Sequence, residues 1–91
     1  MTDKVHCAHI LVSTHTEVLE IQKMLQSGES FSKLSAERST CPSGKRGGDL
    51  GTFGRGQMVK EFEKAAFALQ KGHVSEPVKT QFGWHLIKRL D

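Results

Sequence analysis

The chain is poor in the residues that build disulfide-stapled or membrane-spanning proteins. Its two cysteines, Cys7 and Cys41, are too few for a disulfide scaffold, and we expect no bridge between them in a reducing compartment. No apolar run approaches the roughly 20 residues that span a bilayer, and the amino-terminal residues show no apolar signal segment. These absences predict a soluble, cytoplasmic protein that is not bound to a membrane.

The sequence also lacks a strong excess of one charge. Its formal net charge is +3 at pH 7, and the pairs Lys45-Arg46 and Lys88-Arg89 are the only adjacent basic residues. A nucleic-acid footprint needs a denser basic cluster, so we expect no nucleic-acid partner. At this length we expect one domain, residues 1–91. The single tryptophan, Trp84, excludes an appended module built on paired tryptophans.

Glycine is abundant in one stretch between Cys41 and Met58. Six of the nine glycines fall there, at positions 44, 47, 48, 51, 54 and 56. Glycine tolerates positive φ and close backbone approach, so a dense run indicates a backbone shape that side chains would block. A thiol opens the stretch and large apolar side chains, Phe53 and Met58, end it. A polar loop of this kind predicts the rim and floor of a pocket.

Periodicity of the apolar residues predicts an α+β domain, with helices packed around a small sheet. The predicted elements are a strand over 5–12, helices capped by Thr14 and Ser30, a short strand over 50–53, a helix over 59–69 stopped by Gly72, a strand region over 73–80 and a last strand over 84–90. In the first strand, alternation places Val5, Cys7, His9 and Leu11 on one face.

In their order along the chain, several of these residues resemble the parvulin family of peptidyl-prolyl isomerases. The matching segments are His9 with its strand, Cys41, Gly48 to Gly51, Phe53, Gly56 to Met58, Phe62, and Thr80 to Ile87. The resemblance covers nearly the whole chain. It implies a four-stranded antiparallel sheet surrounded by helices, with the first and last strands adjacent at its centre. The implied order is strand, two helices, a further short helix, strand, helix and two strands.

The resemblance also implies a site. Its catalytic residues would be His9, Cys41, Thr80 and His85. The two histidines would form a hydrogen-bonded pair, Thr80 would bond to one of them, and Cys41 would lie near the substrate carbonyl. The residues that would hold the substrate proline are Leu50, Met58, Phe62 and Phe82.

Other interpretations of the same residues remain open. A free cysteine such as Cys41 is most often a small buried apolar residue, and Leu50 fits an ordinary core. A thiol phosphatase loop is excluded because Gly47 stands where an arginine is required, and a P-loop because Arg46 replaces the required Ser or Thr. The set Cys7, His9, Cys41 and His85 lacks the usual zinc-ligand spacing. We therefore expect neither a metal nor a cofactor.

The implied function is acceleration of rotation about X-Pro bonds in proline-containing peptides and in unfolded or flexible proteins. The alternative is a chaperone or scaffold module that binds proline segments with little turnover. The loop at 13–17 has no Lys or Arg, so recognition of a phosphoserine before proline is not expected. We expect an uncharged or apolar residue before proline, a non-covalent mechanism and a monomeric enzyme.

Overall fold

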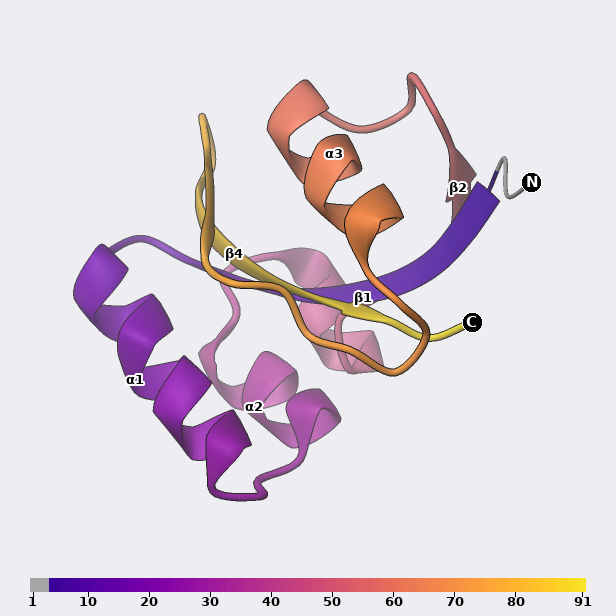
Figure 1. The fold of residues 1–91 in the computed structure, drawn as a ribbon. Coiled ribbons are helices and arrows are strands. Elements are labelled where there is room, and N and C mark those ends of the chain that lie inside the picture. Colours follow the sequence, from indigo (N-terminus) through magenta and orange to yellow (C-terminus); the bar gives the residue numbers. More distant parts are fainter. Residues whose placement is uncertain (1–3) are drawn as a thin grey trace.

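A computed structural model describes residues 4–91 as a four-stranded antiparallel sheet with helices on both faces (Figure 1). The strand order is β2-β1-β4-β3. The elements are β1 (Lys4–Val12), α1 (His15–Gln26), α2 (Phe31–Arg38), the 3₁₀ helix η1 (Pro42–Arg46), β2 (Asp49–Gly54), α3 (Lys60–Ala68), β3 (Val78–Thr80) and β4 (Gly83–Arg89). The predicted α+β class and the central first and last strands are confirmed.

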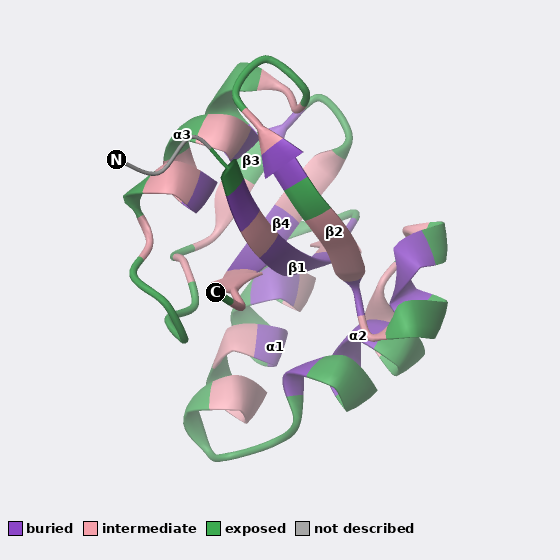
Figure 2. Ribbon diagram, turned by 90° about the vertical axis from the view of Figure 1, so that its right-hand side faces the viewer, coloured by how far each residue is buried: buried purple, intermediate pink, exposed green. Residues whose placement is uncertain are grey.

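The two central strands are buried on both sides, as Figure 2 shows by colour. On one face of β1, Val5 and Cys7 pack with α3 around Phe62. On the other face, Ala8, Ile10 and Val12 pack with residues of α1 and α2. The alternation predicted for this strand is therefore confirmed, and it divides the core into two apolar clusters on opposite sides of the sheet.

The helices α1 and α2 begin at the predicted capping residues. The hydroxyl of Thr14 accepts a hydrogen bond from the backbone N–H of Glu17 at 3.2 Å. Ser30 caps α2 in the same way through the N–H of Lys33 at 3.3 Å. These bonds satisfy N–H groups that have no partner within a first helical turn. None of the helices within residues 4–91 is long and apolar enough to cross a membrane.

The carboxyl-terminal third differs from the sequence prediction in two places. The helix α3 ends at Ala68 because Leu69 adopts extended dihedral angles (φ −76°, ψ 146°), so the prediction that Gly72 stops it is wrong. Only Val78–Thr80 of the region 73–80 forms a strand, and Val74 makes one isolated bridge to Lys88. Both segments contact β4, through the bond that Arg89 donates to the carbonyl of Leu69 and through the bridge of Val74, and such contacts leave no signal in the local periodicity.

Candidate active site

An apolar cavity of about 490 Å³ opens between α3, the glycine-rich loop and the β3–β4 hairpin. Its walls come from residues far apart in sequence: His9, Leu11, Thr40, Cys41, Pro42, Leu50, Gln57, Met58, Val59, Phe62, Phe82 and His85. Seven of the eight predicted site residues line this cavity. The eighth, Thr80, lies buried behind it and bonds to His85 at 2.7 Å.

The side of the cavity suited to an apolar ring is formed by Leu50, Met58 and Phe62. Phe62 is buried on α3 and its ring stands nearly perpendicular to both histidine rings, with centroids 5.5 Å from His9 and 5.2 Å from His85. Phe82 lies at the tip of the hairpin and is 61% exposed. The cavity therefore has a fixed apolar floor and an open aromatic rim.

The two histidines form a direct pair in the centre of the sheet. Leu11 pairs with His85 and His9 with Ile87, so the register of β1 and β4 brings the two imidazoles together. Their Nδ1 atoms lie 3.0 Å apart and their rings are close to parallel, at 21°. The two histidines are 76 residues apart in sequence, and the pairing of β1 with β4 brings them into contact.

The hydrogen bonds around Thr80 select one arrangement of protons. The backbone N–H of Phe82 donates to Thr80 Oγ1 at 3.1 Å, and the one acceptor among the described contacts for the proton of the threonine hydroxyl is His85 Nε2, at 2.7 Å. His85 then carries its proton on Nδ1 and donates to Nδ1 of His9, whose proton sits on Nε2. The opposite arrangement would leave the Thr80 proton without an acceptor among the described contacts. His9 Nε2 is buried and has no hydrogen-bond partner in residues 4–91.

Both histidines are uncharged at neutral pH. Burial lowers the pKa of His9 to about 4, and the neighbouring His85 lowers it further in the same direction. Burial also lowers the pKa of His85. A neutral pair can hold a fixed chain of hydrogen bonds, whereas two imidazolium rings would repel each other across 3.0 Å.

Cys41 stands at the start of η1, half-buried at the mouth of the cavity. Ser43 donates its hydroxyl proton to Cys41 Sγ at 3.2 Å. Ser39 Oγ accepts from the backbone N–H of Leu11 at 3.0 Å and from that of Cys41 at 3.3 Å, which ties this loop to the end of β1. The other cysteine, Cys7, is buried in β1 and both thiols are free.

The backbone of His9 is held from two sides. Its N–H donates to the carbonyl of Gly48 at 2.9 Å, and its carbonyl accepts from Ser35 Oγ at 3.1 Å. Gly48 has φ +83°, and a Cβ at this position would overlap the carbonyl oxygen of His9. The glycine-rich loop and the buried Ser35 of α2 therefore fix the strand segment that carries the histidine.

A metal centre is not apparent in the part of the chain that the structure describes. Within residues 4–91 no three His, Cys, Asp or Glu side chains are grouped to hold an ion. His6, which is outside the cavity, pairs instead with Asp49 at 2.7 Å. A hydrogen bond from the Gly51 backbone, followed by the bond to His6, lowers the pKa of the Asp49 carboxyl.

This geometry agrees with what known proteins show. Residues 9–91 match the family model of the PPIC-type PPIase domain, also described as rotamase. The chain belongs to this family, the parvulins. It is 52% identical over 89 residues to the foldase protein PrsA of Geobacillus kaustophilus, covering 97% of this chain and 32% of the relative. It is 56% identical over 68 residues to the peptidyl-prolyl isomerase Pin1 of Digitalis lanata, covering 75% and 58% of the two chains.

A solved parvulin structure supports the same conclusion. The solution structure of NmPin from Nitrosopumilus maritimus superposes with a TM-score of 0.89 at 52% identity, covering 100% of this chain and 99% of that one. The predicted family and fold are thus confirmed. The parvulin domain described here spans about a third of the length of the PrsA foldase that it matches.

Some residues of this parvulin site were not predicted from the sequence. The cavity lining includes five that were not singled out: Leu11, Thr40, Pro42, Gln57 and Val59. Each lies within two residues of a predicted one, so sequence proximity was the available signal. The supports Ser35 and Ser39 gave no signal, because a buried serine is recognised only when its partner across the fold is known.

Proposed function

We propose that this parvulin domain accelerates cis/trans isomerisation of X-Pro bonds in unfolded or flexible polypeptides by twisting the bond without a covalent intermediate. The observation that carries the proposal is the apolar floor of Leu50, Met58 and Phe62 beside a buried neutral histidine pair. The floor suits a proline ring, and the rings of His9 and His85 stand directly beside Phe62.

The chemistry asks for differential binding rather than for bond making. Rotation about a peptide bond has a barrier of about 18–20 kcal/mol, and the X-Pro bond isomerises in tens to hundreds of seconds without help. A site that binds the twisted amide better than either planar form lowers this barrier, by about 1.4 kcal/mol for each tenfold gain in rate. Gripping the ring while the preceding carbonyl turns beside Cys41 meets this need.

In this proposal, Cys41 acts as a polarisable neighbour of the turning carbonyl and does not attack it. Rotation about the X-Pro bond requires no bond to the carbonyl, and the hydrogen bond that Ser43 donates to Cys41 Sγ at 3.2 Å adds a polar contact to the thiol. The histidine pair forms part of the cavity wall. It holds the strands β1 and β4 and their side chains in one hydrogen-bonded arrangement that ends at Thr80.

For the residue before proline, we propose a preference for uncharged or apolar side chains. The turn between β1 and α1 consists of Ser13 and Thr14, and His15 begins the helix, so the two-armed recognition that Arg gives a phosphate is missing there. The lining near Cys41 contributes Leu11 and Pro42, which are apolar.

We further propose that the clients are folding or flexible proteins, and that the domain works as a cytoplasmic monomer. The relative named as a foldase supports the first point. Two free thiols, one half-exposed, suit a reducing compartment. Sedimentation of the purified protein and fractionation of its host cell test the last two points. A stable dimer or an extracytoplasmic location would contradict them.

Exchange NMR on a short Ala-Leu-Pro peptide tests the function. Addition of a catalytic amount of protein should make the cis and trans peaks exchange within the mixing time, and without protein they should not. Binding shifts without faster exchange would favour the alternative, a module that holds proline segments with little turnover. A phosphoserine-proline peptide turned over far faster than a leucine-proline peptide would contradict the proposed specificity.

A further inference from the structure

A shallow depression of about 360 Å³ lies on α3 beside the proline cavity. Its lining residues are Arg55, Lys60, Glu63, Lys64, Phe67 and Ala68. Lys60 of the depression directly follows Val59 of the cavity wall, so the two hollows lie on different sides of α3 and are separated by about the 10–12 Å diameter of one helix. An extended polypeptide advances about 3.3 Å per residue, so a chain with its proline in the cavity reaches the depression within a few residues.

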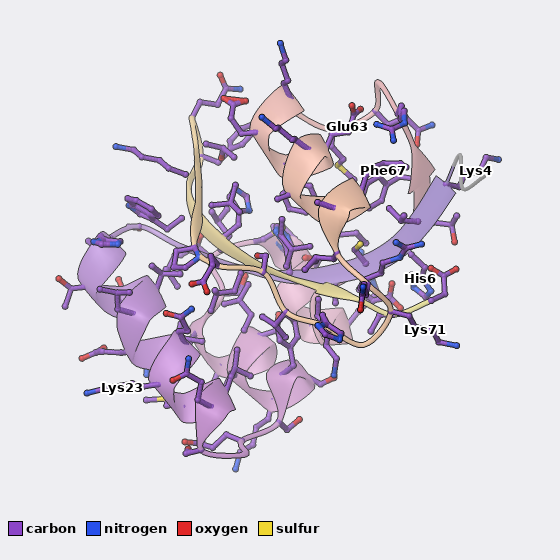
Figure 3. All side chains as sticks on the ribbon, viewed as in Figure 1. Lys4, His6, Lys23, Glu63, Phe67 and Lys71 are labelled. Atoms are coloured by element: carbon purple, nitrogen blue, oxygen red, sulfur yellow. The ribbon has the colours of Figure 1, made fainter. Side chains whose placement is uncertain are left out.

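The depression carries a net positive charge. Three of its side chains are cationic, Arg55, Lys60 and Lys64, and none of them forms an ion pair with a carboxylate in residues 4–91. The one acid, Glu63, accepts a hydrogen bond from the backbone N–H of Gly56. Figure 3 shows Glu63 and Phe67 on the side of α3 that faces the loop from β2. Glu63 is therefore engaged in holding this loop, and the cations remain available.

Arg55 is held ready for a planar anion. Its guanidinium carbon lies 4.2 Å from the centroid of the Phe67 ring, and that ring packs in turn against Phe53 at 6.3 Å. A guanidinium stacked on an aromatic face keeps its N–H edges free for two parallel bonds to a carboxylate. Because the stacking already restricts the arginine, it loses less rotamer freedom when an anion binds.

We propose that this depression is a subsite for a carboxylate side chain of the client, a few residues from the proline that occupies the cavity. The inference rests on the proposed function and adds a substrate feature to it. It assigns acidic selection to α3 and the loop before it, and not to Lys45 and Arg46 of the glycine-rich loop.

Pairs of peptides test the subsite. Each pair contains one Leu-Pro bond and differs only by Glu or Gln at one position, two to four residues before or after the proline. Exchange NMR gives kcat/KM for each peptide. At one or more positions, the Glu peptide should exceed its Gln partner by about two- to fivefold at low salt, the range of an exposed ion pair. The ratio should fall toward one at high salt because exposed charges are screened.

Charge-removing variants locate the effect. The triple variant Arg55→Gln, Lys60→Gln, Lys64→Gln should bring the Glu-to-Gln ratio to one. The matched control, Lys45→Gln with Arg46→Gln, removes two positive charges elsewhere and should keep the wild-type ratio. If the triple variant folds poorly, the double variant Lys60→Gln, Lys64→Gln changes only exposed lysines and should lower the ratio part of the way.

The outcomes separate the two proposals. If wild-type protein isomerises the Gln peptides but shows a ratio of one at every position, the subsite is rejected and the isomerase function stands. A ratio that survives in the triple variant also rejects the subsite. If no Gln peptide is isomerised, the proposed function itself fails.

Discussion

At the scale of single residues, the division of work between Met58 and Cys41 is open to a direct test. Met58→Ala removes part of the apolar floor and should raise KM about tenfold, since each buried methylene contributes about 0.8 kcal/mol. Cys41→Asp places a negative group beside the carbonyl, where the thiol is only polarisable, and should retain activity within about tenfold of wild type. Steady-state kinetics on a neutral Leu-Pro peptide measures both.

A third variant, Cys41→Ser, separates the two possible roles of the thiol. If Cys41 acts as a polarised neighbour, Asp should support more activity than Ser at this position. If the thiol attacks the carbonyl, both variants should be inactive, and that result would contradict the non-covalent mechanism.

The histidine pair gives the stability of the domain a defined pH dependence. Burial holds the pKa of His9 at about 4, below its ordinary value of 6.5. Between these two values His9 binds a proton in the unfolded chain and not in the folded one, so its effect on stability is absent well above pH 6.5 and becomes destabilising as the pH drops toward 4. The loss is at most 1.36 kcal/mol per pH unit, or about 3 kcal/mol over this interval from His9.

Urea unfolding at pH 7.5, 6, 5 and 4.5 measures this slope. His9→Asn should remove the part of this slope that comes from His9, so that only the smaller part from His85 remains. His73→Gln, which removes an exposed histidine, is the matched control and should keep the wild-type curve. The depressed pKa of Asp49 acts only at lower pH, below the ordinary carboxyl range. An unchanged slope in His9→Asn would show that another group is responsible.

The residues that line the cavity were easier to predict than those that hold them in place. His9, Met58 and Phe62 belong to an ordered pattern that resembles one family, so the sequence identified them together. The proton arrangement of the pair depends on the contact of the buried Thr80 hydroxyl with His85 Nε2 at 2.7 Å. Such a contact follows from the turn geometry and cannot be obtained from residue type or spacing.

At the scale of elements, the glycine-rich loop is required where it touches β1. Gly48→Ala should destabilise the domain by more than 2 kcal/mol, about twice the usual effect of a single substitution. The new methyl would overlap the carbonyl of His9 and approach the hydroxyl of Ser35, in addition to the strain of φ +83°. Thermal and urea unfolding measure the loss.

Gly51→Ala provides the matched control. Gly51 also has a positive φ, +75°, but a Cβ there would meet nothing within 4 Å. It should therefore show only the left-handed backbone cost of about 1–2 kcal/mol. Equal losses in the two variants would mean that close approach to His9 has no energetic importance.

Elements with local signals were predicted well, and those defined by docking were not. Thr14 and Ser30 predict the starts of α1 and α2, because each capping side chain bonds to the backbone N–H of the residue three positions later. The end of α3 depends on Leu69, which leaves the helix and packs into the cluster around Phe62. The adjacency of β1 and β4 came from the family resemblance, since strand periodicity does not say which strands pair.

At the scale of the whole molecule, the reaction rate of the Cys7 thiol measures how often the sheet opens. It lies in the central strand β1 with no exposed surface, and burial raises the pKa of its thiol to about 11. Cys41 is half-buried at the cavity mouth. In a native thiol titration at pH 7.5, Cys41 should react quickly. Cys7 should react only when α3 and the sheet separate, at a rate that follows global unfolding.

Cys41→Ser isolates the slow thiol, and adding urea below the unfolding midpoint should accelerate its reaction in proportion to the unfolded population. Gly48→Ala, which weakens the contact of the glycine-rich loop with β1, should accelerate it at the same urea concentration. Gly51→Ala should do so less. If Cys7 reacted as fast as Cys41 in native protein, or independently of urea, the sheet would open locally. The rigid pairing of His9 and His85 across the central strands would then not persist in solution.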